Sequence, residues 1–293
     1  MKPFGLNIHS MIPLPGCTEQ KETPDVSIRF GHVPDALPGA TLTRACSQEC
    51  SGRFLLIVDH VARYLVENGE SITIQRSPEA TDDELRLFLM SNVWAVLLLQ
   101  RGLLPLHGCG IKAGSGAVVF AGPSGNGKST LAAALMNRGF PLITDELSAV
   151  CTNGQPMLLP GFPQILLWAD ALKKLGIDSR KLVCARPALL KYIVPAESRM
   201  VANPVFLKRI YILSVNNGTD LAVTSLKGMR KIHALIDTTY RSHHVEGQDL
   251  KNVHFKQCSD AVKYIDVKQV TRGADPFDIE SLVSLIMEDL QHG

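Results

Sequence analysis

Apolar and polar positions alternate with the period of β-strands over the first eighty residues. Val26–Phe30 alternates residue by residue, and Phe54–Val58 is a short apolar run. Val61–Val66 and Ser71–Ile74 lie on either side of Asn68-Gly69, a dipeptide that favours a tight turn. This spacing predicts a hairpin or meander and therefore a β-rich N-terminal region.

The period changes to that of a helix at Thr81. Thr81-x-x-Glu84 has the spacing of a capping box, and Gly102 is a plausible end for the helix. The positions expected on one helix face are Leu85, Phe88, Leu89, Asn92, Val93 and Val96. We therefore expect a domain boundary near Pro78, with a β-rich domain over residues 1–78 and a second domain over 79–293.

The second region reads as strand, turn, strand, loop, helix and strand, which is typical of an α/β fold. The expected elements are strands at Leu106–Lys112, Ala117–Phe120 and Leu142–Thr144, with a helix at Lys128–Arg138. Farther along, the pattern predicts a strand at Phe206–Ser214 and helices at Ala169–Leu175, Met229–Arg241, Cys258–Ile265 and Pro276–Leu290. The last helix has Asp275 as its expected N-cap and Pro276 at its first position.

Composition places the chain among ordinary globular proteins. Of its 293 residues, 45% are hydrophobic and 20% are charged, which excludes intrinsic disorder and a collagen-like repeat. The net charge of +2 is too small to argue for a nucleic-acid partner or an anionic membrane. The longest apolar run, Val93–Leu99, is far shorter than the ~18–20 residues that cross a bilayer.

The seven cysteines are odd in number and scattered, a pattern that favours reduced thiols over a disulfide framework. Cys46 and Cys50 are the only close pair, and no further ligands stand at zinc-site spacing beside them. The N-terminus has no apolar segment of the signal-peptide kind. We therefore expect a cytoplasmic protein.

The strongest chemical signal is the sequence GPSGNGKS at residues 122–129, which matches G-x-x-x-x-G-K-[ST] in full. It lies between an apolar strand and a helix, as a phosphate-binding loop does. Its backbone N–H groups and the helix N-terminus would hold a polyphosphate. Lys128 would contact the β- and γ-phosphates, and Ser129 would supply a hydroxyl to Mg²⁺. The expected nucleotide-binding residues are Gly122, Pro123, Ser124, Gly125, Asn126, Gly127, Lys128, Ser129 and Thr130.

Two acids and one histidine lie near this loop in the sequence. Asp145-Glu146 directly follows the strand Leu142–Thr144, where carboxylates could hold Mg²⁺, orient water or accept a proton. The alternative is a solvated pair at a strand end. His107 precedes the loop by one hairpin, and a lone histidine is more often structural than catalytic.

The segment LHGCGIKAGSGAVVFAGPSGNGKSTLAAALMNRGFPLITDE resembles the catalytic core of bacterial HPr kinase/phosphorylase. The shared features are His107-Gly108, the phosphate-binding loop, Arg138-Gly139 and the two acids. Within that family, the chain looks closest to the HPr-kinase-like proteins of peptide-modifying gene clusters, including lasso-peptide precursor kinases. Further segments that resemble these proteins are spread over most of the chain, among them residues 4–10, 100–107, 160–163 and 239–241.

The resemblance implies a P-loop kinase core of the HPr kinase type with a smaller β-rich N-terminal domain. It implies ATP- and Mg²⁺-dependent phosphorylation of a serine hydroxyl on a peptide or small protein. In that picture Asp145 accepts the serine proton or orients the hydroxyl, while Glu146 and Ser129 serve Mg²⁺. Lys128 stabilises the transferred group, and His107 lies near the γ-phosphate. The family also implies a homo-oligomer.

The chain departs from the family in two places. The family commonly has two aspartates where this chain has Asp145-Glu146. In addition, the glycine-rich signature that supports reverse phosphorolysis is not evident, and Pro160–Pro163 stands in a comparable place. These departures weaken the expectation that HPr is the substrate or that the protein removes phosphate, and the sequence leaves reverse phosphorolysis open.

Basic residues in the C-terminal half could grip substrate or phosphate, although most arginines are simply exposed. The candidates are Arg186, Arg199, Arg230 and Arg241. Arg241 is favoured because it ends an expected helix beside Tyr240 and precedes His243-His244. The histidine pair has no further ligands at metal-site spacing, so we interpret it as part of a polar loop.

Three functions remain open from the residues alone. The first is a serine kinase acting on a peptide or small protein, and the second is a small-molecule kinase. The third is a nucleotide-gated adaptor, which would have no need of a base at Asp145. An enclosed polar pocket would favour a small acceptor, and an open groove a peptide. The N-terminal region either binds a partner or completes the fold.

Overall fold

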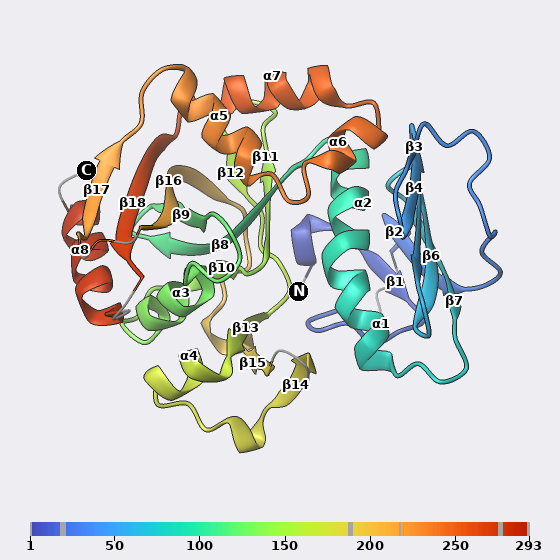
Figure 1. Cartoon of the computed structure of the whole chain (residues 1–293), viewed down its shortest axis with the longest axis horizontal. Helices are drawn as coiled ribbons and strands as arrows, with labels where there is room; N and C mark the ends of the chain where they lie inside the picture. The colour runs from blue at the N-terminus through green and yellow to red at the C-terminus, as the bar shows by residue number, and fades with distance from the viewer. Residues whose placement is uncertain are drawn as a thin grey trace.

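The computed structural model describes residues 2–17, 22–186, 190–216, 218, 220–274 and 278–291. The chain forms a mixed α/β structure with a seven-stranded sheet, an eight-stranded sheet and a small three-stranded sheet. In Figure 1 the first sheet, in blue, is separated from the rest by the teal helices α1 and α2. None of the helices in these described ranges is long and apolar enough to cross a bilayer.

The N-terminal region forms the seven-stranded sheet, in the order β1-β2-β7-β6-β5-β4-β3. The predicted meander is confirmed, because β5, β6 and β7 pair antiparallel in sequence order around the Asn68-Gly69 turn. The strands are β1 (Ile8–Ser10), β2 (Val26–Phe30), β3 (Leu42–Thr43), β4 (Ser47–Cys50), β5 (Arg53–Val58), β6 (Ala62–Glu67) and β7 (Ser71–Arg76).

The helical segment after this sheet begins as the capping box predicts. The Thr81 hydroxyl accepts from the Glu84 N–H, and the Glu84 carboxylate accepts from the Thr81 N–H. Helix α1 (Asp82–Phe88) continues through one π-helical turn into α2 (Trp94–Gln100). Residues 94–99 are buried all round, because α2 packs between the first sheet and the second.

The eight-stranded sheet carries most of the residues to which the sequence analysis assigns chemistry. Its order is β10-β8-β11-β12-β16-β18-β17, and β9 pairs with both β8 and β16. Strands β9, β16 and β18 run parallel to one another. The strands are β8 (Leu104–Ala113), β9 (Gly116–Ala121), β10 (Leu142–Thr144), β11 (Leu147–Cys151), β12 (Met157–Leu158), β16 (Val205–Asn216), β17 (Ala222–Ser225) and β18 (Asp266–Gly273).

Helices cover both faces of this sheet, which explains why β9 reads as a continuous apolar run. Val118 and Phe120 pack into a core with α3 (Lys128–Met136) and α8 (Ile279–Gln291). Val119 and Ala121 face the opposite core, with α5 (Met229–Thr238) and α7 (Lys251–Ala261). The short helix α6 (His243–Gly247) joins α5 to α7.

The small sheet has the order β13-β15-β14 and was not predicted. Its strands are β13 (Gln164–Trp168), β14 (Val183–Arg186) and β15 (Lys191–Pro195). Helix α4 (Ala169–Lys174) follows β13 and matches the helix predicted over Ala169–Leu175. Three short 3₁₀ turns complete the described structure, at Pro3–Gly5, Ser179–Lys181 and Glu197–Arg199.

Two predicted helices differ from the observed ones. The helix expected at Cys258–Ile265 instead begins at Lys251 and ends at Ala261. Its buried face includes His254, a polar residue that hydrophobic periodicity does not register. The helix expected to reach Arg241 ends at Thr238, because the Tyr240 N–H donates to the Pro105 carbonyl in a strand-like contact. The expected cap at Asp275 and Pro276 lies outside the described residues.

Candidate active site

The loop at residues 122–129 connects β9 to α3, as the motif predicts. Gly122 has φ 131°, and a Cβ there would lie 2.7 Å from the Leu213 carbonyl oxygen, so only glycine fits. Gly127 stands at the N-cap of α3 with φ 90°. The Asn126 side chain donates to the same Leu213 carbonyl at 2.8 Å. The loop is therefore fixed against β16, with the α3 N-terminus beside it.

Lys128 is buried under this loop. Its Nζ donates to the carbonyls of Gly122 and Pro123, each at 2.9 Å. The pKa of Lys128 is lowered to about 8, chiefly by burial; Asp145 opposes this shift and the nearby Lys191 adds to it. The ammonium thus stands where a phosphate chain enclosed by the loop would meet it.

The two acids occupy a break between two strands that pair with β8. Strand β10 pairs with Gly110 and Ile111 of β8, and β11 pairs with residues 104–107. Leu147 stands opposite His107, so the preceding Asp145 and Glu146 lie over the middle of β8. On its other side, Gly108 pairs with Ala121, the residue before the loop. The strand register therefore brings His107, both acids and the phosphate-binding loop together.

Asp145 is bound on both carboxylate oxygens. The Ser129 hydroxyl donates to its Oδ1 at 2.8 Å, and the Leu166 N–H donates to its Oδ2 at 2.7 Å. Burial raises the pKa of Asp145, against the opposing effects of the Leu166 hydrogen bond and the Lys191 charge. Asp145 is thus more basic than an exposed aspartate and is directly linked to the loop serine.

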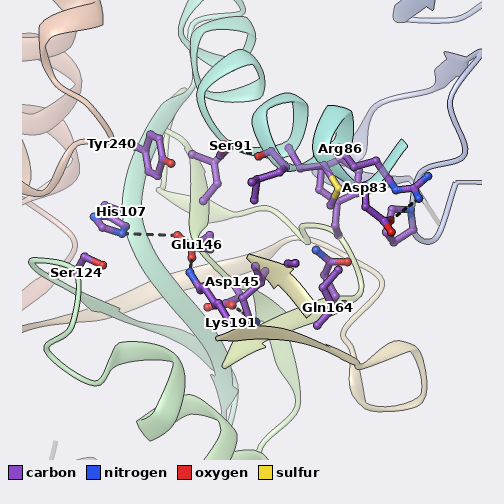
Figure 2. A pocket seen from close by; sticks show the side chains of 18 of the residues that line it. Asp83, Arg86, Ser91, His107, Ser124, Asp145, Glu146, Gln164, Lys191 and Tyr240 are labelled. Carbon is purple, nitrogen blue, oxygen red and sulfur yellow. Dashed lines mark hydrogen bonds and ion pairs between the residues drawn. The ribbon is translucent and has the colours of Figure 1, made fainter. Parts of the chain in front are cut away.

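Glu146 lies between a lysine and a histidine (Figure 2). Its Oε1 accepts from Lys191 Nζ, and its Oε2 lies 3.8 Å from His107 Nε2. Lys191 begins β15 of the small sheet, and no motif in the sequence marks it. In the sequence it appears only as a lysine at the start of a short apolar segment. In the structure its side chain is largely buried.

His107 is a neutral imidazole near pH 7. Its pKa is lowered to about 3, chiefly by burial and also by the positive charges of Lys128, Lys191 and Arg241. The edge of its ring meets Tyr240, with centroids 5.3 Å apart. It can therefore exchange a hydrogen bond at the site but contributes no positive charge.

Two adjacent cavities meet at these residues. One, of about 280 Å³, is lined by the loop and the start of α3, including Gly125, Gly127, Ser129 and Thr130. The other, of about 390 Å³, lies between α1, the acids and the small sheet. We call them the phosphate cavity and the acceptor cavity. Both are lined by His107, Ser124, Glu146, Leu166 and Lys191.

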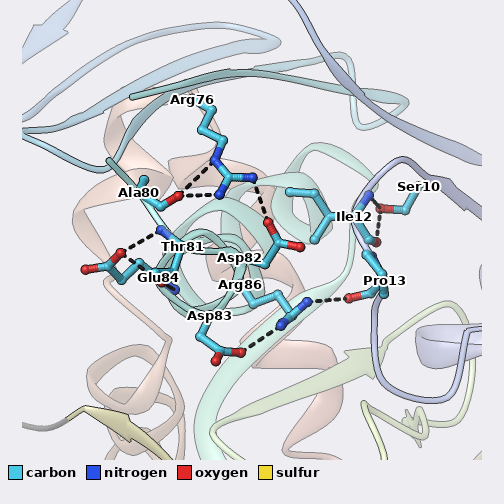
Figure 3. A network of polar contacts seen from close by, with 10 residues as sticks. All are labelled: Ser10, Ile12, Pro13, Arg76, Ala80, Thr81, Asp82, Asp83, Glu84 and Arg86. Atoms are coloured by element: carbon cyan, nitrogen blue, oxygen red, sulfur yellow. Dashed lines mark hydrogen bonds and ion pairs between the residues drawn. The ribbon is translucent and has the colours of Figure 1, made fainter. Parts of the chain in front are cut away.

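The acceptor cavity combines an apolar wall with a charged rim. Apolar side chains come from distant parts of the chain, including Phe4, Met90 and Phe162. The rim includes Asp83 and Arg86 of α1. Figure 3 shows the contacts of this helix: Arg86 donates to Asp83 of the same helix at 2.7 Å and, toward the N-terminal region, to the Pro13 carbonyl at 3.2 Å. At the start of the helix, Arg76 binds Asp82. The N-terminal region therefore builds part of this cavity.

Backbone conformation marks the same cavity. Seven described residues other than glycine have a positive φ. Three of them line the acceptor cavity: Phe4 at 56°, Glu146 at 63° and Arg241 at 46°. Side chains other than glycine rarely adopt this conformation, and such residues concentrate at functional sites. The positive φ changes the direction in which each of these three side chains leaves the backbone, and the packing around them maintains this strained conformation.

The predicted arginines separate into different places. Arg241 lines the acceptor cavity. Arg230 lies on α5 and lines another depression with Ile212 and His233. Arg199 donates to Asn137. The side chain of Arg186 lies outside the described residues.

The donor set fits Mg²⁺. The Ser129 hydroxyl and the Asp145 and Glu146 carboxylates are hard oxygen ligands, and they lie beside the loop that would hold the phosphates. Magnesium is usually bound by one or two carboxylates together with substrate phosphates. Ser129 and Glu146 could therefore hold the ion in a nucleotide complex, with the Asp145 carboxylate beside them.

No protein-family model matches the chain, and no curated protein matches it. Among solved structures, the HPr(Ser) kinase/phosphatase from Coxiella burnetii is similar, with 14% sequence identity and a TM-score of 0.35. The match covers 64% of this chain and 91% of that one. At this TM-score the similarity assigns neither a family nor an activity to the chain.

Proposed function

We propose that this protein is an ATP-dependent kinase that phosphorylates a serine hydroxyl of a peptide or small protein. The observation that carries the proposal is the meeting of two cavities at one group of ionisable residues. A loop that fits phosphates lines one cavity. The acids and His107 stand where it opens toward the other. A nucleotide-gated adaptor would need the first cavity only.

The chain's residues divide the work of in-line transfer between them. The acceptor hydroxyl oxygen bonds to the γ-phosphorus, the bond from that phosphorus to the β–γ bridging oxygen breaks, and ADP leaves. Asp145, which lines the acceptor cavity and has a raised pKa, takes the hydroxyl proton. Lys128 and the loop N–H groups balance the charge on the phosphates. Bound with ATP, Mg²⁺ would neutralise further negative charge there.

Glu146 and Lys191 act as a pair at the boundary between the cavities. The Lys191 contact holds the Glu146 carboxylate toward His107. We assign Glu146 to the ion, with Ser129. Neutral His107 is placed to hydrogen-bond the transferred group or the hydroxyl, without adding charge.

A small hydroxylated molecule is the second candidate for the acceptor. A volume of about 390 Å³ lies within the ~300–1,000 Å³ of small-ligand sites. The apolar wall formed by Phe4, Met90 and Phe162 favours an acceptor with apolar groups beside its hydroxyl over a bare polyol. A serine flanked by apolar residues in a short peptide meets that requirement.

Intact-mass analysis with Mg²⁺-ATP tests the proposal. The acceptors are a precursor peptide encoded beside the gene and, for comparison, HPr. We expect a phosphate increment on the peptide. Asp145→Asn should bind ATP normally and slow transfer by about 10²–10⁴-fold, the usual contribution of a positioned base. Glu146→Gln should instead need more Mg²⁺ and recover with added metal.

Three outcomes would contradict parts of the proposal. Full activity of Asp145→Asn would remove Asp145 from the mechanism. A phosphate increment on small hydroxylated molecules alone would move the acceptor class to the second candidate. ATP binding with no transfer to either class of acceptor would favour the adaptor.

A further inference from the structure

A separate cluster of metal-ligating side chains joins the first sheet to helix α6. His243 and His244 begin α6, and Glu49 lies on β4, almost 200 residues earlier. One ligand atom from each of the three residues lies within 4.8 Å of the others. His244 Nδ1 is 2.7 Å from Glu49 Oε1, and the two imidazole centroids are 4.2 Å apart. None of these residues lines the phosphate or acceptor cavity.

The cluster is enclosed and its hydrogen bonding is incomplete. Glu49 is 0% exposed and His244 is 2% exposed. His244 Nε2 is buried without a hydrogen-bond partner. A metal held by both Glu49 and His244 would bind Nδ1 in place of this hydrogen bond, because Nε2 faces away from Glu49, and Nε2 would then carry the ring proton. The observation that points to an ion is therefore the gathering of three ligand atoms in a largely buried place.

The surrounding residues shape the cluster around Glu49. A Cβ on Gly247 would lie 2.6 Å from Glu49 Cδ, so a glycine is needed for α6 to come this close. Gln248 Nε2 donates to Glu49 Oε2 at 3.3 Å and to the Arg53 carbonyl at 3.0 Å. Gln248 in turn accepts from Gln100 of α2 at 2.9 Å. Supporting contacts of this kind orient the ligands of metal sites.

We propose that Glu49, His243 and His244 form a binding site for a divalent transition metal, with zinc as the occupant. Two imidazoles and one carboxylate are ligands that zinc commonly takes, and three protein ligands leave a fourth position for water. His243 is half-buried, so an ion can enter from its side.

The ion would fix the segment that leads into α6. That segment includes Tyr240 and Arg241, which line the acceptor cavity. Without the ion, Glu49 of β4 is linked to this segment by hydrogen bonds with His244 and Gln248. The metal would add a further link between the first sheet and α6, beside the core that the two sheets share, and this role does not depend on the acceptor.

Metal binding by the full-length, untagged protein tests this proposal. The protein is stripped with a chelator, its thiols are blocked with N-ethylmaleimide, and zinc is added. We expect one equivalent by mass spectrometry of the metal. At about a hundredfold excess of zinc over Kd, the melting temperature should rise by about 5 °C or more. Cobalt in place of zinc should give visible d–d bands without thiolate charge transfer.

Variants separate this site from adventitious binding. His243→Ala should lower zinc affinity by at least about tenfold and remove the thermal shift. Glu49→Gln should do the same if it folds; since Glu49 is fully buried, His243→Gln is the second test. His32→Ala removes an exposed histidine outside the cluster and should change nothing. No zinc bound by the intact protein, or equal affinity in His243→Ala, would overturn the proposal.

Discussion

At Lys128, one buried ammonium should set how nucleotide affinity depends on pH. Its pKa of about 8 in the free protein lies below that of an exposed lysine because of burial. Bound phosphates would raise that pKa. Below pH 8 the lysine is charged in both states, so it adds no pH dependence. Above pH 8, binding must take up a proton, and affinity falls by up to about tenfold per pH unit.

Trp168 provides the measurement. It is 41% exposed and lines the phosphate cavity, whereas Trp94, the other tryptophan, is fully buried. Fluorescence titration with ATP should give a Kd that is constant from pH 7 to 8 and rises above it. Lys128→Met should bind weakly at every pH, without this slope. A wild-type Kd that stays flat to pH 9 would show that Lys128 does not titrate there.

For single residues, the sequence predicts a site only where the residues that form it are neighbours in the chain. The loop motif names its own residues because a phosphate contacts consecutive N–H groups. Lys191 follows Glu146 by forty-five positions. It comes close because β15 pairs with β13, and Leu166 of β13 binds the neighbouring Asp145. Glu49 likewise reaches His244 across 195 positions. No local pattern could reveal either partner, which is why the histidine pair read as a polar loop.

Among the structural elements, the connection from β9 to α3 depends on where its glycines stand. Both Gly122 and Gly125 have positive φ, but their surroundings differ. A Cβ at Gly122 would meet the Leu213 backbone at 2.7 Å, whereas one at Gly125 would meet nothing within 4 Å. Backbone cannot move aside as a flexible side chain can. Substitution at Gly122 therefore tests close packing and backbone conformation together, whereas substitution at Gly125 tests backbone conformation alone.

We expect Gly122→Ala to abolish ATP binding and to lower the free energy of unfolding by about 2–4 kcal/mol, from the positive φ and the backbone clash together. Gly125→Ala should cost about 1–2 kcal/mol, from φ alone, and should weaken binding less. Chemical denaturation and the Trp168 titration measure both quantities. Equal losses in the two variants would contradict the close approach to β16.

Elements were predictable where one face or both faces are apolar. β9 and β16 read correctly because helices bury them on both sides. The start of α7 was missed because His254, hydrogen-bonded to Thr239 at 2.8 Å, fills a core position with a polar residue. The small sheet was missed because β14 and β15 are mostly only partly buried and have no clear period. Tertiary contacts decide these cases, and a single sequence does not show them.

For the whole molecule, the sequence predicted neither the order of the strands nor the core that the two larger sheets share. The expected boundary near Pro78 remains a prediction. The largest core contains side chains of the first sheet, such as Tyr64 and Ile72, and of α2. It also contains Leu147, Phe162 and Tyr240, which lie at the candidate site. A core of this kind should couple the stability of the two sheets.

Phe4 provides the test of that coupling. It is 3% exposed, and its ring packs against Phe162 at 5.6 Å and Trp94 at 6.0 Å between centroids. Its N–H also donates to the Pro160 carbonyl at 2.6 Å. Phe4→Ala should cost about 3–5 kcal/mol, because a large buried ring leaves a cavity. Phe30→Ala, at a ring that is 37% exposed, should cost about 1 kcal/mol or less.

The form of the transition is as informative as its midpoint. If the sheets share one core, Phe4→Ala shifts a single unfolding transition, seen alike by far-UV circular dichroism and by Trp94 fluorescence. If the first sheet is a separate cooperative unit, the variant moves one of two transitions and leaves the other in place. Because Phe4 also lines the acceptor cavity, the single transition would mean that the N-terminal region shapes the substrate site and cannot be removed without losing it. Two transitions would instead mean that the N-terminal region folds as a separate unit and can be removed without disrupting the phosphate cavity.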